Sequence, residues 1–261
     1  MSVDYALDGD IATITIDRPD RYNAIEASLS EGLTRAMERA GSESRAAILT
    51  GSGRAFCAGA DLAELMSEYE TGEGPDLAAL LEDVFHPALH AVLECRVPVI
   101  GAMNGVAAGA GMGLALACDL RVMADEAYFT SAFTAIGLVP DSGTTWWLPH
   151  SLGVPLALEL ALTNRRLGAV EARERGLCVD VCPLEDLPSR ARELASTLAE
   201  MVPDALVTTR RLIREAAGKS LDQAMDVEQS EQGRLGRTAA HHEGVMAFTE
   251  KRKPDFRGLR D

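Results

Sequence analysis

Two segments of the chain repeat one local pattern, in which a short apolar strand leads through small residues into the start of a helix. The first, 51–62, reads GSGRAFCAGADL, and the second, 99–117, reads VIGAMNGVAAGAGMGLALA. Glycine and alanine let a ligand approach the backbone closely. The first N–H groups of a helix have no intrahelical partner and lie at its positive end. Each segment is therefore predicted to present backbone N–H groups to an anion.

Together, the two segments could supply one donor each to the same oxygen atom. Such a pair is an oxyanion hole, in which each donor lowers the barrier by about 2.7–4 kcal/mol. The same residues also suit a tight strand-to-helix turn and a buried helix packed through alanine and glycine. These residues alone leave both interpretations open.

Strands that alternate with helices along the chain predict an α/β core with parallel strand pairing. The expected strands are Val3–Leu7, Ile11–Asp17, Ala46–Thr50, Val97–Met103, Leu120–Ala124, Tyr128–Ser131 and Cys178–Cys182. The expected helices are 26–40 (ended by Gly41), 77–94, 110–117, one holding Trp146 and Trp147, and 155–163, 169–175, 186–201, 204–217, 221–234 and 238–250.

The helical end of the chain predicts a division into two regions. Residues 1–200 are expected to form the core with the active site, and residues 201–261 a helical cap or oligomerisation region. The acidic segment 67–76, which carries glycine and proline, is expected to be a mobile surface loop.

The charge balance excludes several classes of partner. The chain has 25 basic and 40 acidic residues and a net charge of −15, so its field repels nucleic acid and anionic membranes. No apolar run reaches the roughly 18 residues that cross a bilayer. A ligand rich in phosphate would therefore need a local cluster of basic residues.

The cysteines argue against disulfides and against a metal site. There are five, an odd number with irregular spacing. Cys178 and Cys182 lie four apart, but no second pair completes a zinc site, so we expect no metal. The acidic, alternating N-terminal residues do not resemble a secretory or transit segment, and we expect a cytoplasmic protein.

Six segments, in order over nearly the whole chain, resemble the crotonase (enoyl-CoA hydratase/isomerase) superfamily. They are RPDRYNAI (18–25), GRAFCAGADL (53–62), PVIGAMNGVAAGAGMGLALACDLRVMADEAYF (98–129), GLVPDSGTTWWLP (137–149), GAVEARERGLCVDVCP (168–183) and FTEKRKPDFRG (248–258). The resemblance implies a ββα spiral core with a helical C-terminal trimerisation region. It also implies an acyl-CoA thioester substrate, no cofactor beyond the CoA moiety, and a homotrimer or a hexamer built as a dimer of trimers.

Carried over by position, the resemblance assigns the site residues. The thioester oxygen would be held by the N–H groups of Ala58 and Ala110, the second of which is commonly glycine in the family. The residues expected to bind CoA are Arg21, Ala24, Arg54, Ala58, Ala60, Asp61, Leu62 and Lys251. For the basic residues, solvated surface charge is the alternative.

The sequence departs from a hydratase at two positions. Family hydratases use two glutamates, whose places fall here at Gly113 and Phe133. Neither residue can transfer a proton, so hydration by the two-glutamate route is not expected. Asp141 follows Pro140 in a GLxPDxG segment that resembles the isomerase members, where the aspartate is the base.

Asp141 suits the shift of a double bond by a single carboxylate. A thioester in an oxyanion hole has acidified α-protons, and one base near two carbons can move a proton between them. Apolar neighbours would raise the pKa of the carboxylate towards the working range. The alternative is that Asp141 caps the helix that follows.

His90 opens a second enzymatic interpretation. In related dehalogenases a histidine at this place activates water against an acyl-aspartate ester. If His90 faces Asp141, hydrolysis is credible; otherwise His90 is an ordinary partly exposed helix residue. We therefore expect an enoyl-CoA isomerase. The alternatives are a hydrolase or dehalogenase using Asp141 and His90, a weak hydratase, and a catalytically silent acyl-CoA-binding protein.

Overall fold

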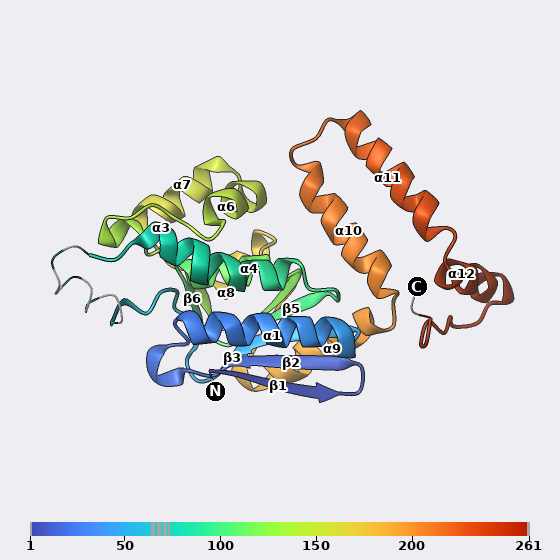
Figure 1. Ribbon diagram of the computed structural model, residues 1–261, viewed down its shortest axis with the longest axis horizontal. Helices are drawn as coiled ribbons and strands as arrows, with labels where there is room; N and C mark the ends of the chain where they lie inside the picture. The colour runs from blue at the N-terminus through green and yellow to red at the C-terminus, as the bar shows by residue number, and fades with distance from the viewer. Residues whose placement is uncertain (1, 64–65, 67–68, 70–71, 73, 260–261) are drawn as a thin grey trace.

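The computed structural model describes residues 2–63, 66, 69, 72 and 74–259 of the chain. Half of the predicted mobile loop at 67–76 therefore lies outside the described residues. Figure 1 shows mixed sheets with helices around them and three helices that extend to one side.

The larger sheet has six strands in the order β1-β2-β3-β5-β7-β10. β1 and β2 form an antiparallel hairpin, and the other neighbours pair in parallel. The strands β3 and β5 are buried on nearly every residue, as expected for parallel strands covered on both faces. The six strands are β1 (Val3–Asp8), β2 (Ile11–Ile16), β3 (Ala46–Gly51), β5 (Val99–Met103), β7 (Leu120–Ala124) and β10 (Asp180–Cys182).

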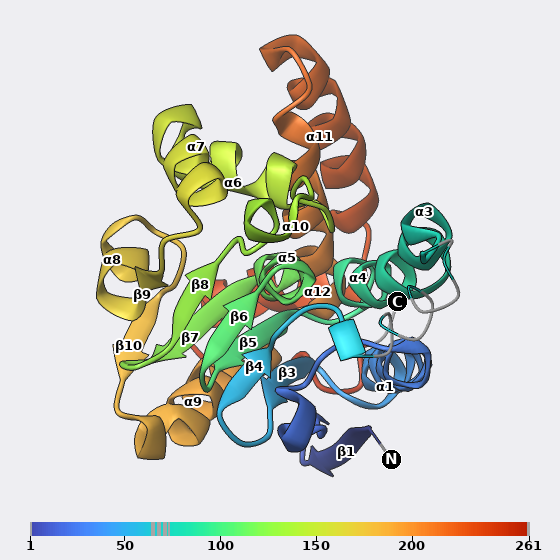
Figure 2. The ribbon, with the colours of Figure 1, turned by 90° about the vertical axis from the view of Figure 1, so that its left-hand side faces the viewer.

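The smaller sheet has four short strands in the order β4-β6-β8-β9. They are β4 (Ala55–Cys57), β6 (Val106–Ala108), β8 (Tyr128–Thr130) and β9 (Leu167–Gly168). Each of the successive pairs β3/β4, β5/β6 and β7/β8 gives one strand to each sheet, so the chain winds as a spiral between them (Figure 2). The expected ββα repeat is thereby confirmed, although β4, β6 and β9 were not predicted as strands.

Helix α1 (Ala27–Glu43) packs against β1 and β2. Its buried residues Leu29, Leu33 and Met37 recur every four positions, which places them on one face. The predicted end at Gly41 is wrong, because the helix continues to Glu43. A Cβ at Gly41 would lie 3.2 Å from the Cβ of Arg96, so glycine serves close packing here.

The predicted helix at 77–94 consists of three consecutive elements. They are α3 (Leu77–Leu80), a π-helical turn labelled η2 (Leu81–Phe85) and α4 (His86–Leu93). Farther along lie α5 (Ala110–Ala117), η3 (Thr134–Ile136), α6 (Thr144–Leu152), α7 (Val154–Thr163), α8 (Ala169–Glu174) and α9 (Leu187–Ala199). All eight residues of α5 are buried, so this helix runs through the centre of the molecule.

Three C-terminal helices lie beside the core, and Figure 1 shows them in orange and red: α10 (Pro203–Ala216), α11 (Leu221–Leu235) and α12 (Ala239–Glu250). Asp119 anchors α10, because its two carboxylate oxygens each lie 3.0 Å from a guanidinium nitrogen, one of Arg210 and one of Arg214. The trimerisation role of these helices and the division near residue 200 remain predictions.

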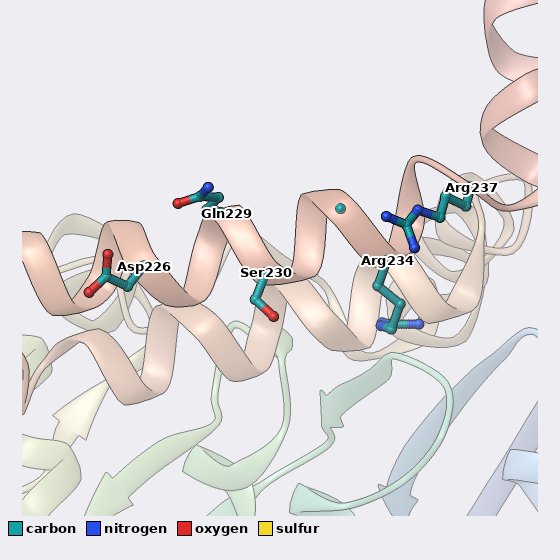
Figure 3. A pocket seen from close by; sticks show the side chains of 6 residues that line it. Asp226, Gln229, Ser230, Arg234 and Arg237 are labelled. Atoms are coloured by element: carbon teal, nitrogen blue, oxygen red, sulfur yellow. The ribbon is translucent and has the colours of Figure 1, made fainter.

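A polar hollow runs along α11 and shows no sign of catalytic chemistry. Figure 3 shows Asp226, Gln229, Ser230 and Arg234 along this helix, with Arg237 just beyond it. Arg234 is paired with Asp204. Among the residues that the structure describes, no helix is long and apolar enough to cross a membrane, and no three metal-binding side chains gather. The five cysteines are unpaired and buried.

Candidate active site

One largely apolar cavity, of ≈ 580 Å³, lies between the two small-residue segments and α3. Its lining residues are Ala58, Ala60, Leu62, Leu77, Ala78, Leu80, Leu81, Phe85, Gly109, Ala110, Ala132, Phe133, Ala135, Ile136, Leu138, Val139 and Asp141. Gly59 joins the two segments closely: at φ +89°, a Cβ on it would lie 2.8 Å from the carbonyl oxygen of Ala108 and 3.2 Å from the nitrogen of Ala110. The two segments therefore meet at one place, as their sequence pattern predicted.

The backbone donors at this place are not quite the predicted pair. The N–H of Ala58 donates to the carbonyl of Tyr22 at 3.0 Å, so it is already used within the protein. The chain reverses direction at Gly59, so the N–H of Ala60 points differently from that of Ala58. Within the described part of the chain, no acceptor receives the N–H of Ala60 or that of Ala110, the first residue of α5. Ala60 therefore replaces Ala58 as the available donor beside Ala110.

Asp141 is the one ionisable side chain among the described residues that line the cavity. The Ser142 hydroxyl donates to its Oδ1 at 2.8 Å. Burial raises the pKa of the Asp141 carboxyl above its ordinary value, while the Ser142 hydrogen bond and the charge of His86 oppose that rise. Helix α6 begins at Thr144 with Gly143 as its N-cap and without a side-chain cap. The alternative that the Asp141 carboxylate caps this helix is therefore wrong.

A family model described as enoyl-CoA hydratase/isomerase matches residues 7–259. The chain belongs to this family. It is 41% identical over 257 residues to a Rhodobacter capsulatus protein described as a probable enoyl-CoA hydratase, with 98% of each chain covered. It is 38% identical over 250 residues to the 1,2-epoxyphenylacetyl-CoA isomerase of Escherichia coli, with 95% of each chain covered.

Solved structures agree with the family assignment. The enoyl-CoA hydratase of Polaromonas sp. JS666 superposes with a TM-score of 0.91 at 33% identity, over 97% of this chain and 98% of that one. The enoyl-CoA hydratase of Bacillus anthracis superposes with a TM-score of 0.90 at 31% identity, over 99% and 100%. The predicted crotonase-type fold is confirmed, and the chain is a family enzyme that acts on CoA thioesters.

The two places expected for hydratase glutamates hold no acid in this family member. Gly113 lies in α5, where a Cβ would come within 2.4 Å of the carbonyl oxygen of Ser142. Phe133 is buried and lines the cavity. The first place thus has no room for any side chain, and the second is filled by an aromatic ring.

His90 does not meet Asp141, so the predicted pairing of these two residues is wrong. Its side chain is 61% exposed, and its Nδ1 lies 3.3 Å from Oε1 of Glu94 on the same helix. His90 lines two other hollows on the surface of α4. The histidine that acts electrostatically on Asp141 is His86, one turn earlier, which was not predicted as a site residue.

The residues expected to bind CoA separate into three groups. Leu62, like Ala58 and Ala60, lines the cavity. Ala24 and Asp61 are buried and hold the loop around the cavity: Arg18 donates to the carbonyl of Ala24 at 2.6 Å and to Asp61 Oδ2 at 3.1 Å. The Asp61 carboxylate is thus engaged with Arg18.

The third group consists of the predicted cations. Arg21 is exposed at the end of the short helix η1 (Pro19–Arg21). Arg54 is exposed and donates to the Tyr22 hydroxyl at 2.8 Å. Lys251 ends α12, which Figure 1 shows towards the opposite end of the molecule from α3. Arg21 and Arg54 therefore lie on loops that adjoin the cavity, and within this chain Lys251 does not.

Ser142 is the main site residue that sequence reasoning missed. It is buried, and it adopts the left-handed region at φ +48°, which a residue other than glycine seldom occupies. The Pro-Asp-Ser-Gly sequence signals a turn at this place. It gives no indication that the hydroxyl points back to the carboxylate.

Proposed function

We propose that this enzyme is an enoyl-CoA isomerase that moves a double bond in an unsaturated acyl-CoA, with Asp141 as its acid–base residue. The observation that carries the proposal is a single carboxylate in an otherwise apolar cavity. The hydratase positions at Gly113 and Phe133 cannot transfer a proton. The similarity to the 1,2-epoxyphenylacetyl-CoA isomerase of Escherichia coli gives further support.

The N–H groups of Ala60 and Ala110 bind the thioester oxygen in this proposal. Both are backbone donors fixed by the fold, and Ala110 also lies at the positive end of α5. They stabilise the negative charge that appears on that oxygen when a proton leaves the substrate. The anion so formed is an enolate, so the protons on the α-carbon of a 3-enoyl chain, and on the saturated γ-carbon of a 2-enoyl chain, become acidic.

Asp141 then carries one proton between two carbons. Its ionised carboxylate takes a γ-proton, and the electron pair of that C–H bond forms the new double bond while the old double bond becomes part of the enolate. The protonated carboxyl returns the proton to the α-carbon, and the electrons of the enolate oxygen restore the carbonyl. Burial, by raising the pKa of the carboxyl, makes it a stronger base. The reaction uses no group beyond the CoA thioester itself.

Arg21 and Arg54 are proposed to bind the CoA phosphates. Both are exposed and lie on the loops that lead to Ala58 and Ala60. The net charge of −15 repels a polyanion, so a local pair of cations is needed for binding.

Solvent deuterium exchange tests the function. The wild type and Asp141→Asn are incubated in D₂O with 3-enoyl-CoA and 2-enoyl-CoA, and exchange and double-bond migration are followed. The variant is expected to lose about 10²–10⁴-fold in exchange, the usual contribution of a general base, while it retains CoA-thioester binding. His90→Ala, as a matched control, is expected to keep full activity, because His90 lies outside the cavity.

Four results would contradict the isomerase proposal. Undiminished exchange in Asp141→Asn would remove the carboxylate from the mechanism. Release of free CoA by the wild type would show hydrolysis, and formation of a 3-hydroxyacyl-CoA would show a hydratase. Binding without any reaction would show a catalytically silent acyl-CoA-binding protein.

A further inference from the structure

The turn 140–143 that carries Asp141 rests directly on α5 at Gly113. A Cβ on Gly113 would lie 2.4 Å from the carbonyl oxygen of Ser142 and 2.8 Å from its Cβ. The first of these atoms belongs to the backbone, so no rotation of a side chain could relieve the overlap. The conformation of this turn therefore requires glycine at position 113.

We infer that Gly113 and Ser142 are positioning residues for Asp141, and that a side chain at position 113 and the observed placement of Asp141 exclude each other. The catalytic consequence rests on the proposed function, whereas the steric relationship does not. It follows that having glycine instead of glutamate at position 113 does more than remove one proton-transfer group of a hydratase. Because glycine has no side chain, the turn that carries Asp141 can pack directly against α5 at this position.

The turn, rather than the helix, must move if position 113 acquires a side chain. All eight residues of α5 are buried in the core, so a shift of this helix would disturb packing along its whole length. The turn is also buried at Ser142 and Thr144, but it is a short connection. Both the N–H and the hydroxyl of Thr144 donate to the carbonyl of Asp141, so a displacement of the turn would carry Asp141 with it.

Ser142 completes the arrangement by orienting the carboxylate. Its hydroxyl donates to Oδ1 of Asp141 at 2.8 Å. No residue in the described ranges donates to Oδ2, which leaves that oxygen available to take a proton from the substrate. The hydroxyl also stabilises the ionised form, and His86 on α4 is the titratable group of a neighbouring element that acts in the same direction on the pKa of Asp141.

Crystal structures and exchange rates of Gly113→Ala test the steric part. The variant is expected to show Ser142 displaced from α5 and to exchange deuterium about 100-fold more slowly, the loss that a misplacement of about 1 Å can cause. Its affinity for CoA thioesters should remain. Gly101→Ala is the matched control: it adds a methyl group at another buried glycine, but the nearest atom, at 2.6 Å, is the flexible end of Met103. It should keep wild-type exchange.

The variant Gly113→Glu tests most directly whether a carboxylate at position 113 and a functional Asp141 can coexist. If the two carboxylates exclude each other, this variant loses exchange and gains no efficient hydration. A variant that hydrates a 2-enoyl-CoA and still shows Asp141-dependent exchange would overturn the inference. So would a crystal structure of Gly113→Ala with Ser142 unmoved. The crystallographic result is informative even if the wild type proves to have another activity.

Ser142→Gly tests the orienting hydrogen bond without straining the turn, because glycine adopts φ +48° readily. Loss of the donor should raise the pKa of Asp141, so the acidic limb of the pH–rate profile should move to higher pH. A purely structural role would lower the rate without moving this limb. An unmoved limb in a variant that folds and binds CoA thioesters would overturn the positioning role of Ser142.

Discussion

The guanidinium of Arg18 lies 3.1 Å from the carboxylate of Asp61, and both side chains are largely buried. The same guanidinium donates to the carbonyl of Ala24. Next to it, the N–H of Ile25 donates to the carbonyl of Gly59 at 2.6 Å. This buried ion pair therefore joins the loop at 18–25 to the turn that carries Ala60.

Asp61→Ala is expected to destabilise the fold by about 1.5–3 kcal/mol, because it removes the buried carboxylate that lies 3.1 Å from the Arg18 guanidinium, while Glu26 stays 4.0 Å from Nε of Arg18. Urea-induced unfolding measures the free energy of unfolding. Asp20→Ala is the matched control, since Asp20 is exposed on the same loop and should change stability by less than about 0.5 kcal/mol. Equal stability of the two variants would show that the ion pair does not hold the turn.

Asp141→Asn is expected to be more stable than the wild type near neutral pH. Burial raises the pKa of the Asp141 carboxyl, so ionisation of this group in the folded state opposes folding. The penalty is fully present above the raised pKa, and it disappears as the pH falls below the ordinary value of 3.8. The stability difference between the two proteins, from urea unfolding at several pH values, should therefore shrink as the pH falls. A difference that stays constant with pH would show that Asp141 has an ordinary pKa.

The sequence predicted the long elements and missed the short ones for a physical reason. Apolar residues spaced along many positions indicated α1 and the C-terminal helices, and continuous apolar runs indicated β3 and β5. The strands Ala55–Cys57 and Val106–Ala108 have three residues each, all of them apolar, so they carry no apolar–polar alternation to detect. Their pairing depends on contacts between distant parts of the chain.

The site was predicted in its chemistry but not in its exact residues. Ala58 and Ala60 are both alanines beside Gly59, and only the reversal of the chain at φ +89° decides which N–H is free. His86 and His90 lie one turn apart on α4, and a π-helical turn precedes them. Because residues four apart share a helix face, helical spacing alone could not select which of the two histidines lies nearer to Asp141.

Asp119 is expected to be the principal anchor of the C-terminal helices. Its carboxylate binds both Arg210 and Arg214 of α10 and also accepts the N–H of Val99 at 2.8 Å. Asp119→Ala leaves two largely buried guanidinium groups with backbone carbonyls as partners but without this carboxylate, and should cost about 3–5 kcal/mol of unfolding free energy. Asp204→Ala, which removes a half-exposed partner of Arg234, should cost no more than about 1 kcal/mol. Similar losses in urea unfolding would contradict this assignment.

The apolar lining of the cavity predicts a preference for acyl chains without a terminal charge. Among its described lining residues no cation is present, and the one charged group, Asp141, would repel a second carboxylate. An acyl chain that ends in a carboxylate would have to bury this charge unpaired. Its kcat/KM should therefore be at least about 10-fold lower than that of the corresponding chain ending in a methyl group, which corresponds to about 1.4 kcal/mol.

Steady-state kinetics with hexenoyl-CoA and its ω-carboxylated counterpart check this preference. Ala78 lines the cavity from α3 and is exposed on its other side, so it accepts a long side chain. Ala78→Lys supplies the missing cation and should raise the relative kcat/KM of the carboxylated substrate, whereas Ala78→Met has a similar length without charge and should not. Equal use of both substrates by the wild type would show that the end of the acyl chain lies outside this cavity, in contact with water.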